Sequence, residues 1–293
     1  MNVPRGRQPV LVGVSRSTAA PWAVRWAADE AAARGLPLLI VHAQEWPSAI
    51  SPETAPGSAG HLWASHFRAT GQALVDTARA EALQLHPDLE VSVGVAEGRP
   101  TEVLQRLSAD ASQVVVGTRL LGDVEAAFVR SRGAGLLGQV ACPVALVPKP
   151  EEPQPEHGGT VVVGVDGSAA SEAAVAYAYE EAALTGARLT AVEVRRPHDA
   201  ARPAVQEEAR LDLAEALAGW NDKYPHVEAE PQVLTGHPAH VLVRAAEHAR
   251  CLVVGSHGRS GWHDALLGST TRSLLHHAHG PLVVVPPQYT GRP

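Results

Sequence analysis

The sequence LVVGSHGRSGWHDALLGSTT, which spans residues 252–271, reads as a buried strand followed by a glycine-rich loop and the start of a helix. Its glycines follow the pattern Gly-x2-Gly-x9-Gly-Ser, at Gly255, Gly258, Gly268 and Ser269. Glycine lets backbone amides come close to a ligand, and the first turn of a helix presents free N–H groups and a positive dipole end. The stretch therefore predicts a site for the phosphates of a nucleotide.

The chain contains two copies of one unit. From the Gly-x-Pro at Gly98 and Gly236 onward, the matched segments are offset by a constant 138 residues. The matched pairs are Val10–Ser17 with Val161–Ser168, Gly98–Pro100 with Gly236–Pro238, Val114–Gly117 with Leu252–Gly255, and Cys142–Pro148 with Gly280–Pro286. A repeat of this length is typical of a duplicated domain. Residues 149–159 alternate proline with charged residues and predict an extended linker between domains 1–148 and 160–293.

Short β-branched runs alternate with alanine-rich helical stretches in each copy. In the second copy we expect strands near Val161–Val165, Leu189–Val194, Glu228–Leu234, Leu252–Gly255 and Leu282–Val285. We expect helices near Ala169–Thr185, Ala204–Lys223, Pro238–His248 and Ser269–His277. Apolar strands that alternate with helices predict an α/β fold in which helices cover both faces of a mainly parallel sheet. Ligands of such sheets bind beyond the carboxyl ends of the strands, so Asp166 and the glycine loop can share one crevice.

These features resemble the universal stress protein family in its tandem-domain form. The resemblance covers both copies and rests on Val165-Asp166-Gly167-Ser168 together with the glycine pattern after the fourth strand of the second copy. It implies a five-stranded Rossmann-like sheet in each domain and dimerisation commonly through the last strand. The family also implies ATP binding, alone or with Mg²⁺, in the subgroup that keeps the glycine pattern.

Transferred by position, the resemblance implies a nucleotide site in the second domain. Asp166 and Val194 would border the adenosine, with Val254 and Gly255 on its other side. The residues implied around the phosphates are Gly258, Arg259, Gly268, Ser269, Thr270 and Thr271. Gly164, which precedes Asp166 on the strand, is included in the same site. The alternative is that these glycines serve only tight turns and that Asp166 only caps a helix.

The first copy departs from this pattern. Ser15 stands in place of the aspartate, and Leu120, Arg130 and Arg132 stand in place of Gly258, Gly268 and Thr270, while Ser131 is kept. Side chains of this size occupy positions where the backbone would have to approach a ligand, so we interpret the first site as degenerate. The alternative is a different anion pocket formed by Arg16, Arg119, Arg130 and Arg132.

Composition limits the function classes. The 293 residues are 45% hydrophobic and 19% charged, as expected for globular domains. Residues 1–150 hold 13 basic and 13 acidic side chains, whereas residues 151–293 hold 11 and 18, which argues against a nucleic-acid partner. Cys142 and Cys251 lack a CxxC partner and suit buried positions in a reducing cytoplasm. No apolar stretch reaches the length of a membrane span, so we expect a soluble cytoplasmic protein with no membrane partner.

The sequence lacks two motifs that are typical of catalytic sites. The sequence has no Gly-x-Ser-x-Gly and no Walker pattern ending in Gly-Lys-Ser/Thr, which favours a binding module over an enzyme. Slow ATP hydrolysis or phosphate transfer stays open because Ser269 and Thr270 could position a water or a metal ion. A scaffold that needs no nucleotide is another alternative. Neither the protein partner nor the choice between a homodimer and an intramolecular domain pair follows from the sequence.

Fifteen histidines suggest metal binding, but no metal site is predicted. His276, His277 and His279 cluster at the end of the last helix, where their spacing does not place all three on one face. His257 lies within the predicted phosphate loop, and His237 and His263 suit surface positions near its mouth.

Overall fold

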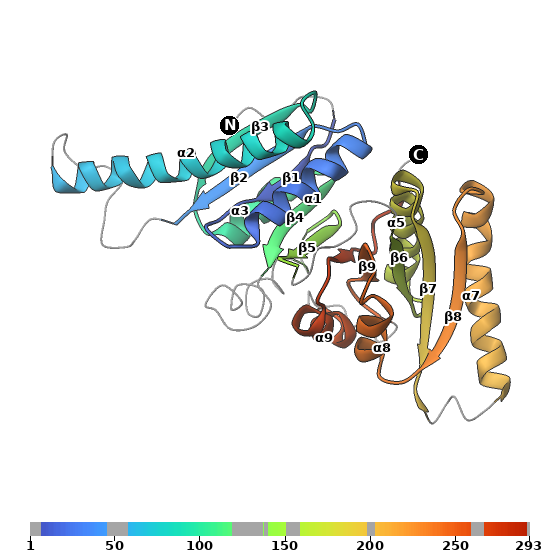
Figure 1. Cartoon of the computed structure of the whole chain (residues 1–293). Coiled ribbons are helices and arrows are strands. Elements are labelled where there is room, and N and C mark those ends of the chain that lie inside the picture. The colour runs from blue at the N-terminus through green and yellow to red at the C-terminus, as the bar shows by residue number, and fades with distance from the viewer. Residues whose placement is uncertain are drawn as a thin grey trace. The chain divides into compact units, whose positions relative to one another are not determined.

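The computed structural model describes residues 7–45, 58–118, 137, 140–150, 159–197, 203–258 and 267–291. It divides into two compact units, Met1–Arg119 and Leu120–Pro293 (Figure 1). The predicted α/β architecture, with a mainly parallel sheet and helices, is confirmed in both.

The described residues of unit 1 form four parallel strands in the order β3-β2-β1-β4. Its elements are β1 (Val10–Gly13), α1 (Ala20–Ala33), β2 (Leu38–Gln44), α2 (Ala59–Leu85), β3 (Val91–Glu97), α3 (Pro100–Ser108) and β4 (Gln113–Thr118). Three consecutive residues at the centre, Val10–Val12, are fully buried, as expected for a strand covered on both faces.

In unit 2, the part of the chain that the structure describes forms six strands in the order β5-β10-β9-β6-β7-β8. Its elements are β5 (Val144–Pro148), β6 (Thr160–Val165), α5 (Ala169–Thr185), β7 (Arg188–Arg195), α7 (Pro203–Lys223), β8 (Ala229–Thr235), α8 (Pro238–Ala245), β9 (Cys251–Gly255), α9 (Ser269–His277) and β10 (Leu282–Val285). The five strands and four helices expected in the second copy are all present. The helix expected to reach His248 ends at Ala245, because the following amides turn back to carbonyls three residues earlier, as in Ala249 N to Ala246 O.

The strand β5 accounts for where the two units divide. The sequence repeat assigns β5 to the first copy, but this strand pairs antiparallel with β10, and Leu282 lies opposite Leu146. The two terminal strands, whose pairing the sequence left open, therefore meet within one chain. The predicted domains 1–148 and 160–293, with a linker over 149–159, follow the repeat and stay a prediction.

The strand order fixes which face each helix covers. In unit 2 the chain moves from β6 to β7 and β8, then returns to β9 on the other side of β6. Because crossovers between parallel strands are right-handed, this reversal puts α5 and α7 on one face and α8 and α9 on the other. Contacts between α5 and α7, and between α8 and α9, agree with this placement (Figure 1). The carboxyl ends of β6 and β9 flank the switch point, where ligands of open α/β sheets bind.

Each unit buries a glutamate at the matched position of its first helix. Glu30 is 1% exposed and pairs with Arg34 at 2.8 Å, one helical turn further along α1. Glu181 is fully buried and pairs at 2.8 Å with Arg250, which directly precedes β9. The buried carboxylate at this matched position is thus paired with an arginine four residues further along the chain in unit 1. In unit 2 it is paired with an arginine that is distant in the sequence.

Tyr179 is on α5, and its side chain contacts residues of α7. Its hydroxyl donates to Asn221 Oδ1 at 2.7 Å, and its ring stacks on those of Trp220 and Tyr224. Burial raises its pKa to about 12. The folded chain then holds this proton more tightly than the unfolded chain, so stability falls as pH rises from about 10 to about 12. We expect an ultraviolet titration of tyrosinate to lose a late phase in Tyr179→Phe, and an unchanged titration curve would contradict the assignment.

Candidate functional site

Asp166 begins the candidate site at the carboxyl end of β6. Its Oδ1 accepts hydrogen bonds from the backbone N–H of Ser168 at 3.0 Å and from the Ser168 hydroxyl at 2.6 Å. Ser168 is the N-cap of α5, and its Oγ accepts from the Ser171 amide at 3.2 Å. Gly167, with φ +72, provides the left-handed turn between them. The aspartate therefore sits on a turn that is held rigidly at the start of a helix.

The glycine loop after β9 lies directly against this turn. A Cβ added at Gly258 would lie 2.7 Å from Asp166 Oδ2, so a larger residue here would require the carboxylate to move. The Ser168 hydroxyl also lies 3.3 Å from the His257 carbonyl oxygen, an alternative acceptor for its proton. His257 itself is tied to the Ser256 hydroxyl through Nδ1 at 2.9 Å. The structure thus brings Asp166 and Gly258 together, as their places in the sequence predict.

The two ends of the glycine loop also converge. The Gly268 amide donates to the Ser256 carbonyl at 3.0 Å, and a Cβ at Gly268 would lie 3.4 Å from the Gly258 nitrogen. Helix α9 begins directly afterwards, with Ser269 exposed and Thr270 half-buried. The backbone N–H groups of this first turn therefore lie next to the glycine loop, where the start of a helix suits an anionic ligand.

Thr271 differs from its two neighbours. Its side chain is buried, and its hydroxyl donates to the Gly255 carbonyl at 2.9 Å. Gly255 is equally constrained, because a Cβ there would lie 2.6 Å from the carbonyl carbon of Ala170 in the first turn of α5. Gly255 thus packs the end of β9 against α5, and the Thr271 hydroxyl joins the first turn of α9 to Gly255.

The other predicted residues lie in the surrounding strands. Val254 is buried near the end of β9, and Val194 is half-buried near the end of β7. Gly164 faces α8, where a Cβ would lie 3.1 Å from Leu242 Cδ1, so its observed role is close packing of helix against sheet. Arg259 lies outside the described residues.

Ser168 was not among the residues predicted to form the site. The structure places its hydroxyl between the Asp166 carboxylate and the loop carbonyl of His257. The Asp-x-Ser spacing before a helix is a capping pattern and was the available signal.

The equivalent turn in unit 1 keeps hydrogen bonds between serine hydroxyls and the backbone but not the charge, and α1 begins there without a side-chain cap. The Ser15 hydroxyl accepts from the Ser17 amide at 3.1 Å, and the Ser17 hydroxyl accepts from the Ala19 amide at 3.2 Å. Gly117 matches Gly255 in its close approach, 2.9 Å from its added Cβ to the Ala19 carbonyl oxygen. The matching loop positions of the first copy, Arg119, Leu120, Arg130, Ser131 and Arg132, lie outside the described residues.

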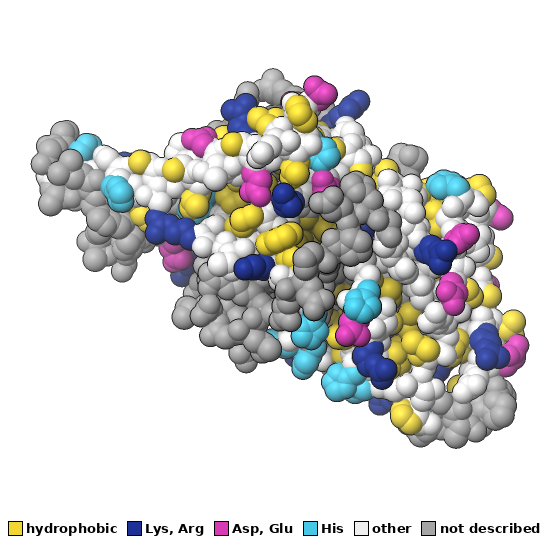
Figure 2. Space-filling view, viewed as in Figure 1, with side chains coloured by type: hydrophobic (Ala, Val, Ile, Leu, Met, Phe, Trp, Pro, Cys, Tyr) yellow, Lys and Arg dark blue, Asp and Glu magenta, His cyan; other side chains and the backbone are white. Residues whose placement is uncertain are grey.

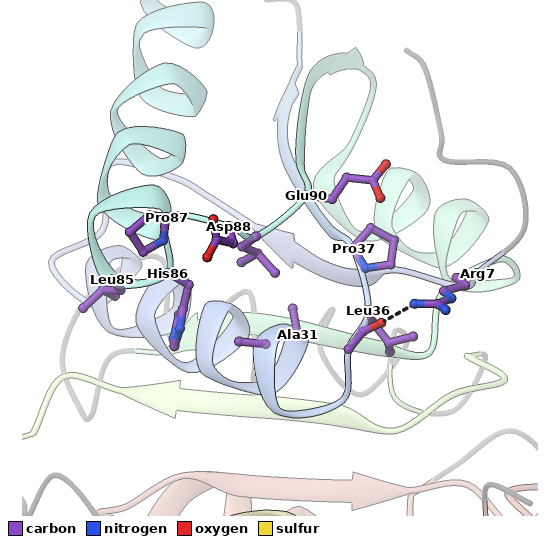
Figure 3. A pocket seen from close by; sticks show the side chains of 12 residues that line it. Arg7, Ala31, Leu36, Pro37, Leu85, His86, Pro87, Asp88 and Glu90 are labelled. Carbon is purple, nitrogen blue, oxygen red and sulfur yellow. Dashed lines mark hydrogen bonds between the residues drawn. The ribbon is translucent and has the colours of Figure 1, made fainter.

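An open cavity of about 800 Å³ lies elsewhere in unit 1 (Figure 3). It is lined by the ends of α1 and α2 and by residues that precede β2 and β3, including Leu36, Leu85 and Glu90. It therefore lies at the amino ends of these strands, whereas the candidate nucleotide site of unit 2 lies at the carboxyl ends of that unit's own strands. Arg7 lines it and donates to the Gly35 carbonyl at 2.9 Å.

Two features of the described residues bear on alternative functions. No helix among them is long and apolar enough to cross a membrane. No three histidine, cysteine or acidic side chains in that part of the chain are placed to hold a metal ion as they stand.

Comparison with known proteins agrees with the repeat and the fold. The sequence matches the Universal stress protein family over residues 6–148 and again over residues 159–286. A universal stress protein of Mycobacterium tuberculosis strain H37Rv is 34% identical over 300 residues, covering 97% of this chain and 99% of the relative. Another, from Mycolicibacterium smegmatis, is 33% identical over 290 residues, covering 95% of this chain and 97% of the relative.

Solved structures show the same architecture. A universal stress protein from Archaeoglobus fulgidus superposes with a TM-score of 0.68, covering 96% of this chain and 97% of that chain at 15% sequence identity. The molecule is thus an α/β protein built from tandem Rossmann-like domains. With its two family matches and its full-length relatives, it belongs to the universal stress protein family.

Proposed function

We propose that this chain binds ATP, alone or with Mg²⁺, in its second domain and acts as a nucleotide-dependent stress-response or signalling module. The observation that carries the proposal is the convergence of Asp166, Gly258 and Gly268 at the switch point between β6 and β9. A carboxylate suits ribose hydroxyls or the adenine amino group, and glycine amides with a helix start suit phosphates.

Each part of the nucleotide has a proposed set of contacts. Asp166, Val194, Val254 and Gly255 border the adenosine. Gly258, Arg259, Gly268, Ser269, Thr270 and Thr271 surround the phosphates, with Thr271 contributing its backbone because its hydroxyl is engaged with Gly255. The first domain contributes no site, because Ser15 replaces the aspartate and Leu120 and Arg130 replace two glycines.

We expect freshly purified full-length chain to bind about one ATP, in keeping with a single functional site. Mass spectrometry of released ligand, followed by calorimetric titration of the stripped protein, measures this. Binding should also raise the melting temperature, because a ligand that binds only the folded state stabilises it. Two ATP per chain would show that the first domain is functional. Absence of titratable binding would favour a scaffold that does not need nucleotide.

A further inference from the structure

Four histidine side chains from two helices of unit 2 lie in ring contact. His237 is the N-cap of α8, and its ring centroid is 5.2 Å from that of His240 in the first turn. The His240 ring is 6.0 Å from that of His277 at the end of α9, which is 6.5 Å from that of His276. In Figure 2, histidine side chains gather over the region of α8 and α9. The sequence suggests only the α9 histidines as a cluster, and α8 supplies the missing partners.

The hydrogen bond of His277 sets the direction of its free nitrogen. Its Nδ1 lies 2.8 Å from the Ser273 carbonyl oxygen. Because a carbonyl oxygen only accepts, Nδ1 carries the hydrogen, and in the neutral ring Nε2 then holds the lone pair. A ring N–H donated to a backbone carbonyl is the arrangement that orients histidines which bind metal ions.

The ring spacings suit a shared metal ion. Two imidazoles bound to one tetrahedral ion, with each nitrogen ~2.1 Å from the metal, have centroids about 5 Å apart. The observed 5.2 Å and 6.0 Å lie close to this value. In the described residues no three such donors converge as they stand, so the rings have to rotate to bind together. His237, His240 and His277 are all exposed, and exposed side chains change rotamer readily.

We propose that His237, His240 and His277 form a site for a divalent transition-metal ion that joins α8 to α9, with water completing the coordination. Imidazole ligands favour Zn²⁺, Ni²⁺ or Cu²⁺, whereas Mg²⁺ prefers oxygen ligands. The site differs in chemistry from the proposed nucleotide site and uses none of its residues. A bound ion would fix the end of α9, the helix whose first turn follows the glycine loop.

Calorimetric titration of the nucleotide-free full-length chain with Zn²⁺ tests the proposal, using protein from which any polyhistidine tag has been removed. We expect about one ion per chain, and His240→Ala should weaken binding by about tenfold or more, because His240 adjoins both other rings. His248→Ala is the matched control, since it removes an exposed histidine of the same unit that follows α8. Its affinity should equal that of the wild type.

Three further measurements make the result specific. Mg²⁺ at the same concentrations should give no saturable binding to the nucleotide-free chain. Zn²⁺ affinity should fall at about pH 5.5, because protons and metal compete for the same nitrogen lone pairs. Melting of the metal-free variants should match the wild type, which separates loss of ligands from loss of fold. Absence of Zn²⁺ binding, or equal losses in His240→Ala and His248→Ala, would overturn the proposal.

Discussion

Gly258→Leu is expected to weaken ATP binding by about 100-fold, a loss of ~2.8 kcal/mol. The reason is steric and local. A Cβ at this position would already lie 2.7 Å from Asp166 Oδ2, and a leucine would push the carboxylate and the loop apart. The backbone at Gly258 is not in the left-handed region, so the new side chain adds no conformational strain of its own. Calorimetric titration with ATP measures the change.

Gly219→Leu is the matched control for this substitution. It adds the same side chain in the same unit, at an exposed helical position where a Cβ meets nothing within 4 Å. We expect its ATP affinity to equal that of the wild type. Its melting temperature should equal that of the wild type or rise slightly, since leucine has a higher helix propensity than glycine. Unchanged affinity in Gly258→Leu, with a folded protein, would remove Gly258 from the phosphate site.

The first domain offers a natural form of the same experiment. It combines Leu120 at the Gly258 position with Ser15 at the Asp166 position. The first copy thus combines a residue larger than glycine, Leu120, with one smaller than aspartate, Ser15. This combination is expected if the two positions approach each other in both copies. Restoring only the aspartate, by Ser15→Asp, should therefore not create a nucleotide site.

Much of the fold was predictable because the sheet is parallel and buried on both faces. Such strands read as apolar runs, and the duplication shows each run twice, as in Val114–Gly117 and Leu252–Gly255. The pairing of β5 with β10 was not predictable, since an antiparallel contact between two terminal strands leaves the same apolar pattern whether it forms within a chain or between chains. The early end of α8 depends on a tight turn that no glycine or proline marks.

The candidate site was predictable to the extent that glycines reveal close approach. Gly255, Gly258 and Gly268 each lie where a Cβ would meet another part of the site or its supporting helix. The engagement of Thr271 with the Gly255 carbonyl was not predictable, because a threonine at a helix start can serve a ligand or its own backbone equally well. The histidine cluster was missed because it joins two helices separated by β9.

The buried glutamates could not be recognised from the sequence either. Glu181 occurs in an alanine-rich helix with a second glutamate beside it, and nothing local distinguishes it as the fully buried residue. Its partner Arg250 is 69 residues away along the chain. This long-range pair ties the C-terminal part of α5 to the start of β9, and it is the basis of the largest effect that we expect on stability.

Arg250→Ala is expected to destabilise unit 2 by ~3 kcal/mol. Arg250 Nε lies 2.8 Å from Glu181 Oε1, and the Arg250 side chain is only 22% exposed. Without the Arg250 cation, the fully buried Glu181 carboxylate loses this partner. The free-energy cost of desolvating the Glu181 charge is then poorly compensated. Hydrogen exchange of peptides from α5 and β9, measured through a urea titration, reports the free energy of unfolding of this unit separately from unit 1.

Arg188→Ala provides the comparison that separates burial from charge. Arg188 pairs with Glu228 at 3.3 Å, but the two side chains are 79% and 80% exposed, so we expect a change of about 0.5 kcal/mol or less. Replacing both buried partners, as Glu181→Leu with Arg250→Met, should recover much of the loss because no unpaired charge remains buried. A loss in Arg250→Ala no larger than that in Arg188→Ala would mean that Glu181 is stabilised chiefly by its other contacts and that the pair does not hold α5 to β9.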